Sequence, residues 1–230
     1  MTPRRMTLGE ARFPKTPEFA QVRRMFSEAI VAQMLALVWE AWHALQANAL
    51  KDIDISLADE QLERSLTEEL ERAMQDRLTH MEPYTVQHES PEMETRSGGS
   101  ARPRQYDIAF VFRANTRIKW PVETKILPTD GQVAAYVADI VDVFATCIYA
   151  PFTGEGAMVG YLKKGKVDAA FQAIAVSLQT PLLDHSLASP RRPHKVSLHK
   201  RTVPTGKSYP KKLRCHHLLF DVSTARIFTP

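Results

Sequence analysis

The sequence predicts an α/β fold in which a central mixed β-sheet is flanked by helices and preceded by an N-terminal helical extension. Apolar residues recur at helical spacing over two long stretches within the first eighty residues. Two apolar runs rich in β-branched and aromatic residues follow, separated by the polar residues 113–116, as expected of a β-hairpin. Helical and strand patterns then alternate, which is typical of a sheet covered by helices.

Length and composition limit the class of protein. The 230 residues are 44% hydrophobic and carry a formal net charge of +4, which suits one large domain or a domain with an appendage. We expect residues 1–55 to form an N-terminal arm and helical extension, and residues 56–230 the main domain. Cys147 and Cys215 give no disulfide framework and no zinc spacing, so a cytoplasmic setting is expected. We find no signal-peptide pattern and no membrane-spanning run.

The N-terminal extension is predicted to be one long helix. Residues 1–17 are polar and hold three prolines, so we expect them to be extended or disordered. From residue 18 to about residue 50 a wide apolar stripe favours a helix that packs against the domain. The alternative is an interaction helix through which the chain binds a protein partner or forms a homodimer.

A second helix is expected over residues 57–80, and it carries an acidic residue on its buried side. Glu63 falls within the apolar arc formed by Leu62, Leu66 and Leu70 when positions are laid out at 100° steps. A carboxylate there needs a partner or a metal ion, unless its stem reaches solvent. Glu69 lies at the edge of the same arc and is the second choice.

The predicted hairpin brings acidic residues together. A first strand is expected over residues 84–88, and a long loop over 89–104 leads directly to Asp107, which opens the next strand. Glu123 closes the strand after that. Lys125 follows two residues later and projects from the same face as Glu123. Two close carboxylates repel unless a cation lies between them, and oxygen ligands suit Mg²⁺, which can activate water for attack on a phosphoryl group. The alternative is that these are ordinary charges at strand ends.

The remaining elements complete the sheet. A turn over residues 128–131 precedes a helix predicted over 132–149, in which Gln132 and Tyr136 are four residues apart and share a face. A buried strand over 157–162, a helix over 167–178 and a final strand over 217–222 follow.

Residues 186–214 form a basic segment without acidic residues. Such a segment is an electrostatic footprint for a polyanion, or else a solvated loop. His194, His199, His216 and His217 fit no zinc spacing, so we predict no histidine metal site. One of His216 and His217 is expected to face solvent. The lysines and arginines of the segment are Arg191, Arg192, Lys195, Lys200, Arg201, Lys207, Lys211, Lys212 and Arg214.

Two motifs in this order resemble a known family. Asp107, followed after a hairpin's length by Glu123-Thr124-Lys125, resembles the PD-(D/E)xK nuclease superfamily, which has the restriction-endonuclease-like fold. The proline that often precedes the aspartate is absent here. Gln132-x-x-x-Tyr136 resembles the additional motif of RecB-like members. The resemblance covers roughly residue 56 to the C-terminus.

The resemblance implies metal-dependent hydrolysis of phosphodiester bonds in nucleic acid, with DNA favoured over RNA and bacterial restriction or phage defence as the first biological hypothesis. Asp107, Glu123 and the carbonyl of Thr124 would bind Mg²⁺, for which Mn²⁺ can substitute. Lys125 would position the attacking water, and Glu63 would complete the catalytic set. The residues expected to contact or orient the substrate are Gln132, Tyr136, Arg102, Arg104, Lys211, Lys212 and Arg214. The alternative function is a catalytically inactive nucleic-acid-binding or assembly subunit of a larger complex.

Overall fold

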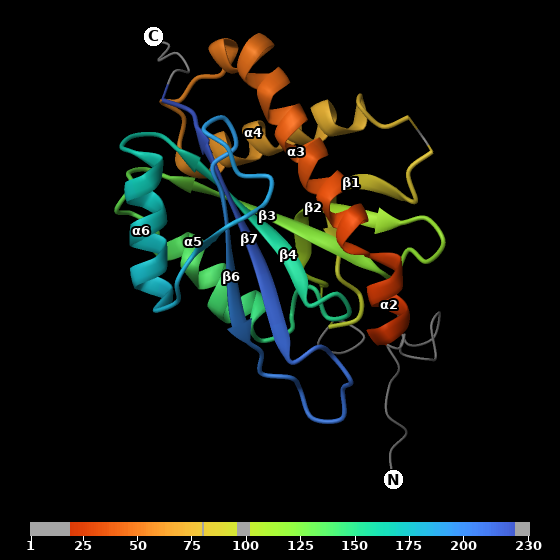
Figure 1. Ribbon diagram of the computed structural model, residues 1–230. Helices are drawn as coiled ribbons and strands as arrows, with labels where there is room; N and C mark the ends of the chain where they lie inside the picture. The colour runs from red at the N-terminus through yellow and green to blue at the C-terminus, as the bar shows by residue number, and fades with distance from the viewer. Residues whose placement is uncertain (1–18, 80, 96–101, 224–230) are drawn as a thin grey trace.

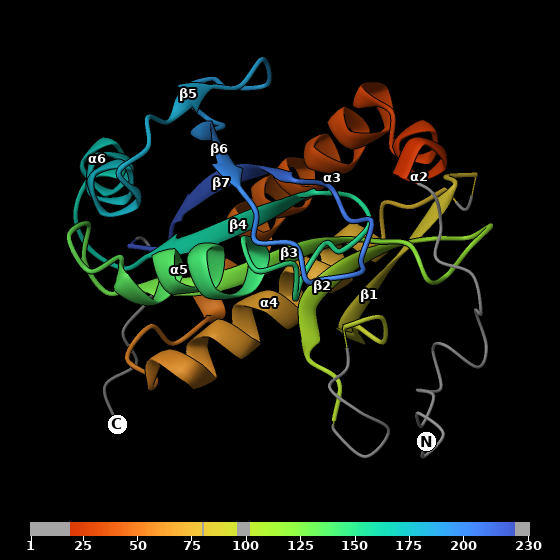
Figure 2. The ribbon, with the colours of Figure 1, turned by 90° about the horizontal axis from the view of Figure 1, so that it is seen from below.

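The computed structural model describes residues 19–79, 81–95 and 102–223. The prediction for residues 1–17 and part of the loop predicted over 89–104 lie outside these ranges. A seven-stranded sheet forms the centre, in the order β1-β2-β3-β4-β7-β6-β5, and Figure 2 shows the strands in this order from one edge to the other. The strands are β1 (Tyr84–Pro91), β2 (Gln105–Phe112), β3 (Lys119–Leu127), β4 (Glu155–Leu162), β5 (Leu183–Asp184), β6 (His194–Lys200) and β7 (Lys212–Asp221).

The sheet is mixed, as predicted. Strands β3, β4 and β7 are parallel to one another, whereas all other neighbouring strands are antiparallel. Because side chains alternate along each strand, the sheet buries a separate apolar cluster on each face.

Helices cover both faces. Helices α2, α3 and α4 contribute to one apolar cluster, and α5, η2 and α6 contribute to the other. Figure 1 shows α5 and α6 beside each other and away from α2 and α3. No helix in the described part of the chain combines the length and apolar character needed to cross a membrane. The helices are α2 (Phe19–Met25), α3 (Glu28–Asn48), η1 (Leu50–Asp52), α4 (Asp59–Gln75), α5 (Ala134–Ala138), η2 (Asp139–Phe144) and α6 (Val167–Leu178).

The N-terminal extension is two helices and not the single helix predicted from residue 18 to 50. The chain breaks at Phe26 and Ser27, and the Ser27 hydroxyl accepts a hydrogen bond from the Ile30 N–H at 3.4 Å, so that Ser27 caps α3. Helix α3 is buried against the sheet: the Trp42 ring stacks on Phe220 of β7 at 4.4 Å with an angle of 4° between the planes. This packing is that of a scaffold helix.

Several predicted elements are confirmed and others are wrong. The hairpin is present as β2 and β3, and α6 spans the predicted residues 167–178. Helix α4 is shorter than the predicted 57–80. The predicted helix over 132–149 begins only at Ala134 and becomes the π-helix η2 at Asp139, so Gln132 precedes it and does not share a face with Tyr136.

The basic segment over 186–214 also differs from its prediction as an irregular loop. It contains all of β6 and the start of β7, which pair antiparallel. Pairing with the buried strand β7 covers parts of both faces of β6: His194 and Val196 are buried on one face and Ser197 on the other. His216 and His217 are both buried, so the expectation that one of them faces solvent is wrong.

Candidate active site

The centre of the candidate site is a fork between β2 and β3. The two strands pair only over residues 108–111 and 119–122, and they separate beyond Val122. Backbone N–H groups at the fork need other acceptors, and carboxylates supply them. The Thr124 N–H donates to Asp107 Oδ2 at 2.7 Å, and the Asp107 N–H donates to Glu123 Oε1 at 3.2 Å. The Ile126 N–H donates to Glu63 Oε2 at 2.9 Å. Acidic side chains therefore take the place of a strand partner.

Lys125 lies among these carboxylates. Its Nζ donates to Glu63 Oε1 of α4 at 3.1 Å and lies 3.3 Å from Asp139 Oδ2, at the start of η2. Burial alone would lower the pKa of Lys125. The negative charges of Glu63, Asp139 and Asp107 outweigh that effect, so the pKa is raised above its ordinary value. The ammonium is thus held in its charged form by groups from three separate elements.

The pKa values of the acidic groups are also raised, which for a carboxyl group favours the neutral form. Burial, followed by repulsion from Asp107 and Asp139, raises the pKa of Glu123 well above its ordinary range, and this side chain is only 4% exposed. Burial also raises the pKa of Glu63 and of Asp139, although Lys125 opposes both shifts. One ammonium does not balance four neighbouring carboxyl groups, and such a set favours an added cation.

The oxygen atoms that remain free suit a hard cation. Asp107 uses Oδ2 for both of its bonds to Thr124, from the backbone N–H and from the hydroxyl at 2.9 Å. Within the described residues, Asp107 Oδ1 and Glu123 Oε2 accept no hydrogen bond. The Thr124 carbonyl points to the fork, because the N–H and C=O of one strand residue face the same side. Mg²⁺ is typically bound by one or two carboxylates and retains several waters, so these residues fit that ion.

Asp139 was not predicted as a site residue. At 100° steps it lies at the edge of the apolar arc that includes Tyr136 and Ile140. The same criterion had pointed to Glu63, so a signal was present in the sequence. Asp139 is the first residue of the π-helix η2, and π-helical turns, although rare, often occur at functional sites.

Of the two acidic candidates on α4, the structure brings Glu63 to the site, whereas Glu69 pairs with Arg72 on the surface. Tyr136 is fully buried, and its hydroxyl lies 3.2 Å from the Met158 carbonyl and 3.0 Å from His217 Nδ1. Tyr136 thus packs α5 against β4 and β7, and its predicted role in orienting the substrate or the groups behind the site stays a prediction. Gln132 is exposed and accepts a hydrogen bond from Thr129.

The predicted basic residues divide into two groups. Arg104 is exposed next to the fork, and its charge partly offsets the raised pKa of Asp139. Arg102 is exposed and donates to Gln105 at 3.4 Å.

The second group does not lie at the fork. Lys211, Lys212 and Arg214 line a groove that α2 and the start of α3 form with the first residues of β4 and β7.

Arg201 belongs to neither group. It is buried and donates hydrogen bonds to three carbonyls, those of Phe144, Tyr149 and Ala150, so its role in the basic segment is structural.

Comparison with known proteins adds no further assignment: no protein-family model, no curated protein and no solved structure matches this chain.

Proposed function

We propose that the chain is a Mg²⁺-dependent nuclease of the PD-(D/E)xK type, which hydrolyses phosphodiester bonds of nucleic acid and favours DNA. The observation that carries the proposal is the convergence of Asp107, Glu123 and Lys125 at the fork, with Glu63 beside them. The order of elements supports it: α4, then β1, β2 and β3, then α5 and β4 is the order expected for a restriction-endonuclease-like core. Restriction or phage defence is the biological role we propose for this activity.

Each residue of the site has a role in the proposal. Asp107, Glu123 and the Thr124 carbonyl would hold Mg²⁺ or Mn²⁺, and the bound ion supplies Lewis-acid chemistry and a nucleophilic water. Lys125 orients that water or stabilises the charge that develops on a phosphoryl oxygen. Glu63 and Asp139 hold the ammonium in place. Arg104, exposed beside the fork, contacts the phosphate backbone, which positions the nucleic acid without reading its sequence.

Cleavage assays on conservative variants test the proposal. Purified protein is incubated with supercoiled plasmid, single-stranded DNA and RNA in Mg²⁺, in Mn²⁺ and in EDTA. The wild type should cleave DNA only with metal, and Asp107→Asn and Glu123→Gln should both abolish cleavage while the fold survives. Glu69→Gln is the matched control, because Glu69 lies on α4 away from the fork, and it should retain full activity.

Two results would contradict the proposal. Undiminished cleavage by both Asp107→Asn and Glu123→Gln would remove the metal site from the mechanism. No cleavage of any substrate by the wild type would instead favour the inactive nucleic-acid-binding or assembly module.

A further inference from the structure

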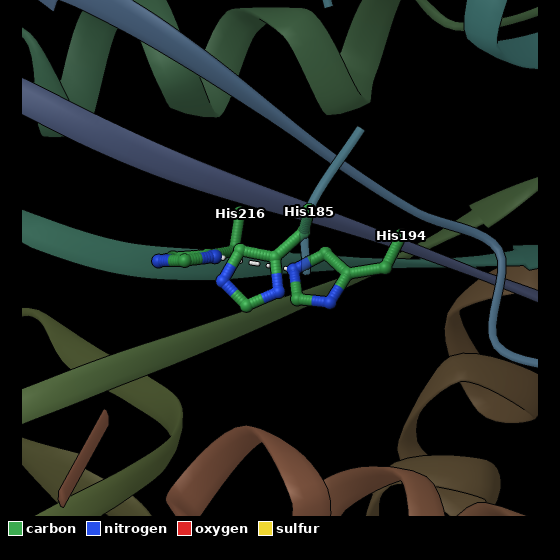
Figure 3. Close-up of side chains that lie close together, drawn as sticks. All are labelled: His185, His194 and His216. Atoms are coloured by element: carbon green, nitrogen blue, oxygen red, sulfur yellow. Dashed lines mark hydrogen bonds between the residues drawn. The ribbon is translucent and has the colours of Figure 1, made fainter. Parts of the chain in front are cut away.

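Three histidines meet on the sheet, away from the fork. His185 follows β5, His194 begins β6 and His216 lies on β7, and one ring nitrogen of each lies within 4.8 Å of the others. Figure 3 shows the three side chains together, with the bond between His194 and His216. Within the described residues this is the only group of three histidine, cysteine, aspartate or glutamate side chains that is so close. We propose that these histidines bind a transition-metal ion, and that Zn²⁺ is the ion they take.

The spacing of the nitrogens supports this proposal. His194 Nε2 lies 3.1 Å from His216 Nδ1. Two imidazole nitrogens bound tetrahedrally to one zinc ion at about 2.0–2.1 Å stand about 3.3 Å apart. The pair therefore needs only a small separation to accept the ion. The His185 ring stacks on the His194 ring at 4.2 Å and lies 5.1 Å from the His216 ring, between centroids. Because stacked rings do not direct their lone pairs to one point, the His185 ring must rotate to become the third ligand.

A carboxylate orients one of the rings. His216 Nε2 lies 2.9 Å from Glu155 Oε1 at the start of β4. Zinc-binding histidines usually donate their other ring N–H to such a carboxylate, which fixes the tautomer and raises the basicity of the ligating nitrogen. Here that arrangement directs the lone pair of Nδ1 toward His194. Glu155 also provides a negative charge close to the ion.

His194 is buried, and Nε2 is the ring nitrogen that lies toward His216 and would ligate the ion. Its Nδ1 has no hydrogen-bond partner among the described residues, and an ion on Nε2 does not change this.

The triad is accessible from one side. His185 is only partly buried, and it lines an open cavity of about 840 Å³ together with Asp184, Lys195 and the start of α6. Three protein nitrogens leave the fourth tetrahedral position of the ion for water. Because the ligands come from β6, β7 and the segment after the short strand β5, the ion would fasten that segment to the sheet.

Metal titration tests the proposal. Untagged, metal-stripped protein is titrated with Zn²⁺ in competition with a chromophoric chelator, in an Asp107→Asn background that removes the carboxylate site as a competing binder. We expect one Zn²⁺ per chain and a rise in melting temperature with Zn²⁺. Glu155→Gln should weaken the affinity by about 10–100-fold, as losing an orienting carboxylate typically does.

Ligand variants and a control complete the test. His185→Asn and His216→Asn should each lose more affinity than Glu155→Gln, whereas His88→Asn on β1, at the opposite edge of the sheet, should bind as the parent does. His185 is partly exposed, so its variant keeps the test valid if His216→Asn does not fold. Absence of stoichiometric Zn²⁺ binding, or unchanged affinity in His185→Asn, overturns the proposal. An equal loss in His88→Asn also overturns it.

Discussion

Replacing Glu123 with glutamine removes one carboxylate from the fork and keeps the size of the side chain. The amide oxygen can still accept the hydrogen bond from the Asp107 N–H. Burial and the charges of Asp107 and Asp139 raise the pKa of Glu123 well above its ordinary value of 4.5. Without metal, we therefore expect Glu123→Gln to be more stable than the wild type at pH 8.

The gain and the loss in the free energy of unfolding can be compared. A hydrogen bond to a charged group contributes about 1.5–3 kcal/mol and one to a neutral group about 0.5–1.5 kcal/mol, so glutamine loses about 1 kcal/mol. Ionising the carboxyl costs the folded state about 1.4 kcal/mol for each unit by which its pKa is raised. Because the pKa of Glu123 is raised well above 4.5, we expect the gain from removing the carboxylate to exceed the lost hydrogen-bond energy. Each kcal/mol of net gain raises the melting temperature of a chain of this size by about 2–4 °C.

The pH dependence has a definite sign. A raised carboxyl pKa destabilises the folded state only above the unfolded-state pKa, and the penalty increases as the pH rises toward the folded-state pKa. The advantage of glutamine should thus be present at pH 8 and largely disappear at pH 4.5, where Glu123 is protonated in the folded state and half protonated in the unfolded state. Mg²⁺ should reverse the order at pH 8, because an ion at ten times its Kd stabilises only the wild type, by about 1.4 kcal/mol.

Thermal unfolding of both proteins at pH 4.5 and pH 8, with and without Mg²⁺, measures these effects. Glu40→Gln on the exposed face of α3 is the control for a general loss of charge, and it should follow the wild type throughout. The reasoning is refuted if glutamine at position 123 destabilises the protein equally at both pH values. Equal stabilisation of wild type and variant by Mg²⁺ would show that Glu123 does not hold the ion.

Three further predictions concern lysines and arginines. Lys125→Ala should lower the cleavage rate by about 10²–10⁴-fold, the usual contribution of a positioned proton-transfer group. Its DNA binding, measured by fluorescence anisotropy, should stay close to that of the wild type. Lys125→Arg should not restore the rate, because a planar guanidinium group does not replace a compact ammonium. Arg201→Met removes hydrogen bonds to three carbonyls. Those of Phe144 and Ala150 keep the N–H groups of Cys147 and Gly154 as donors, whereas the Tyr149 carbonyl keeps no donor among the described residues. The variant should cost about 1–3 kcal/mol in urea unfolding, so a cost below about 1 kcal/mol would contradict the structural role. In the variant with Lys211, Lys212 and Arg214 all changed to glutamine, the plot of log binding constant against log salt concentration should be shallower by up to about 2.7, at about 0.9 per phosphate contact. An unchanged slope would show that these residues do not contact DNA phosphates.

The hairpin and its acidic residues could be predicted because local patterns determine them. Alternation along a strand fixes the face of Glu123 and Lys125, and the polar turn fixes which strands pair. The fork itself could not be predicted. The hydrogen-bond ladder between β2 and β3 ends where the carboxylates of Asp107 and Glu63 accept hydrogen bonds from N–H groups of β3. The position of Glu63 depends on how α4, which is distant in sequence, packs against the sheet.

Features that arise from long-range pairing were missed. His185, His194 and His216 have no zinc-like spacing, and only the antiparallel pairing of β5, β6 and β7 brings them together. Residues 186–214 were predicted to be irregular because their many charged residues obscure the alternation of the two faces of β6. This alternation is recognised only when β7 lies beside β6. Asp139 was missed although helical spacing places it at the edge of an apolar arc, because the sequence pattern does not show that it begins a π-helix beside Lys125.

The two oxygens of Asp107 have different tasks in this structure, and this decides which variant tests the metal site. Oδ2 supports the fork by accepting from the Thr124 N–H and hydroxyl, whereas Oδ1 accepts no hydrogen bond from the described residues. Alanine would remove both and leave the Thr124 N–H without its acceptor, a cost of about 1–3 kcal/mol. Asparagine keeps one acceptor oxygen and replaces the other with an amide nitrogen, which donates and cannot bind a cation. A loss of cleavage in Asp107→Asn with an unchanged melting temperature therefore reports on the metal ion, while the same loss in Asp107→Ala would also include damage to the fork.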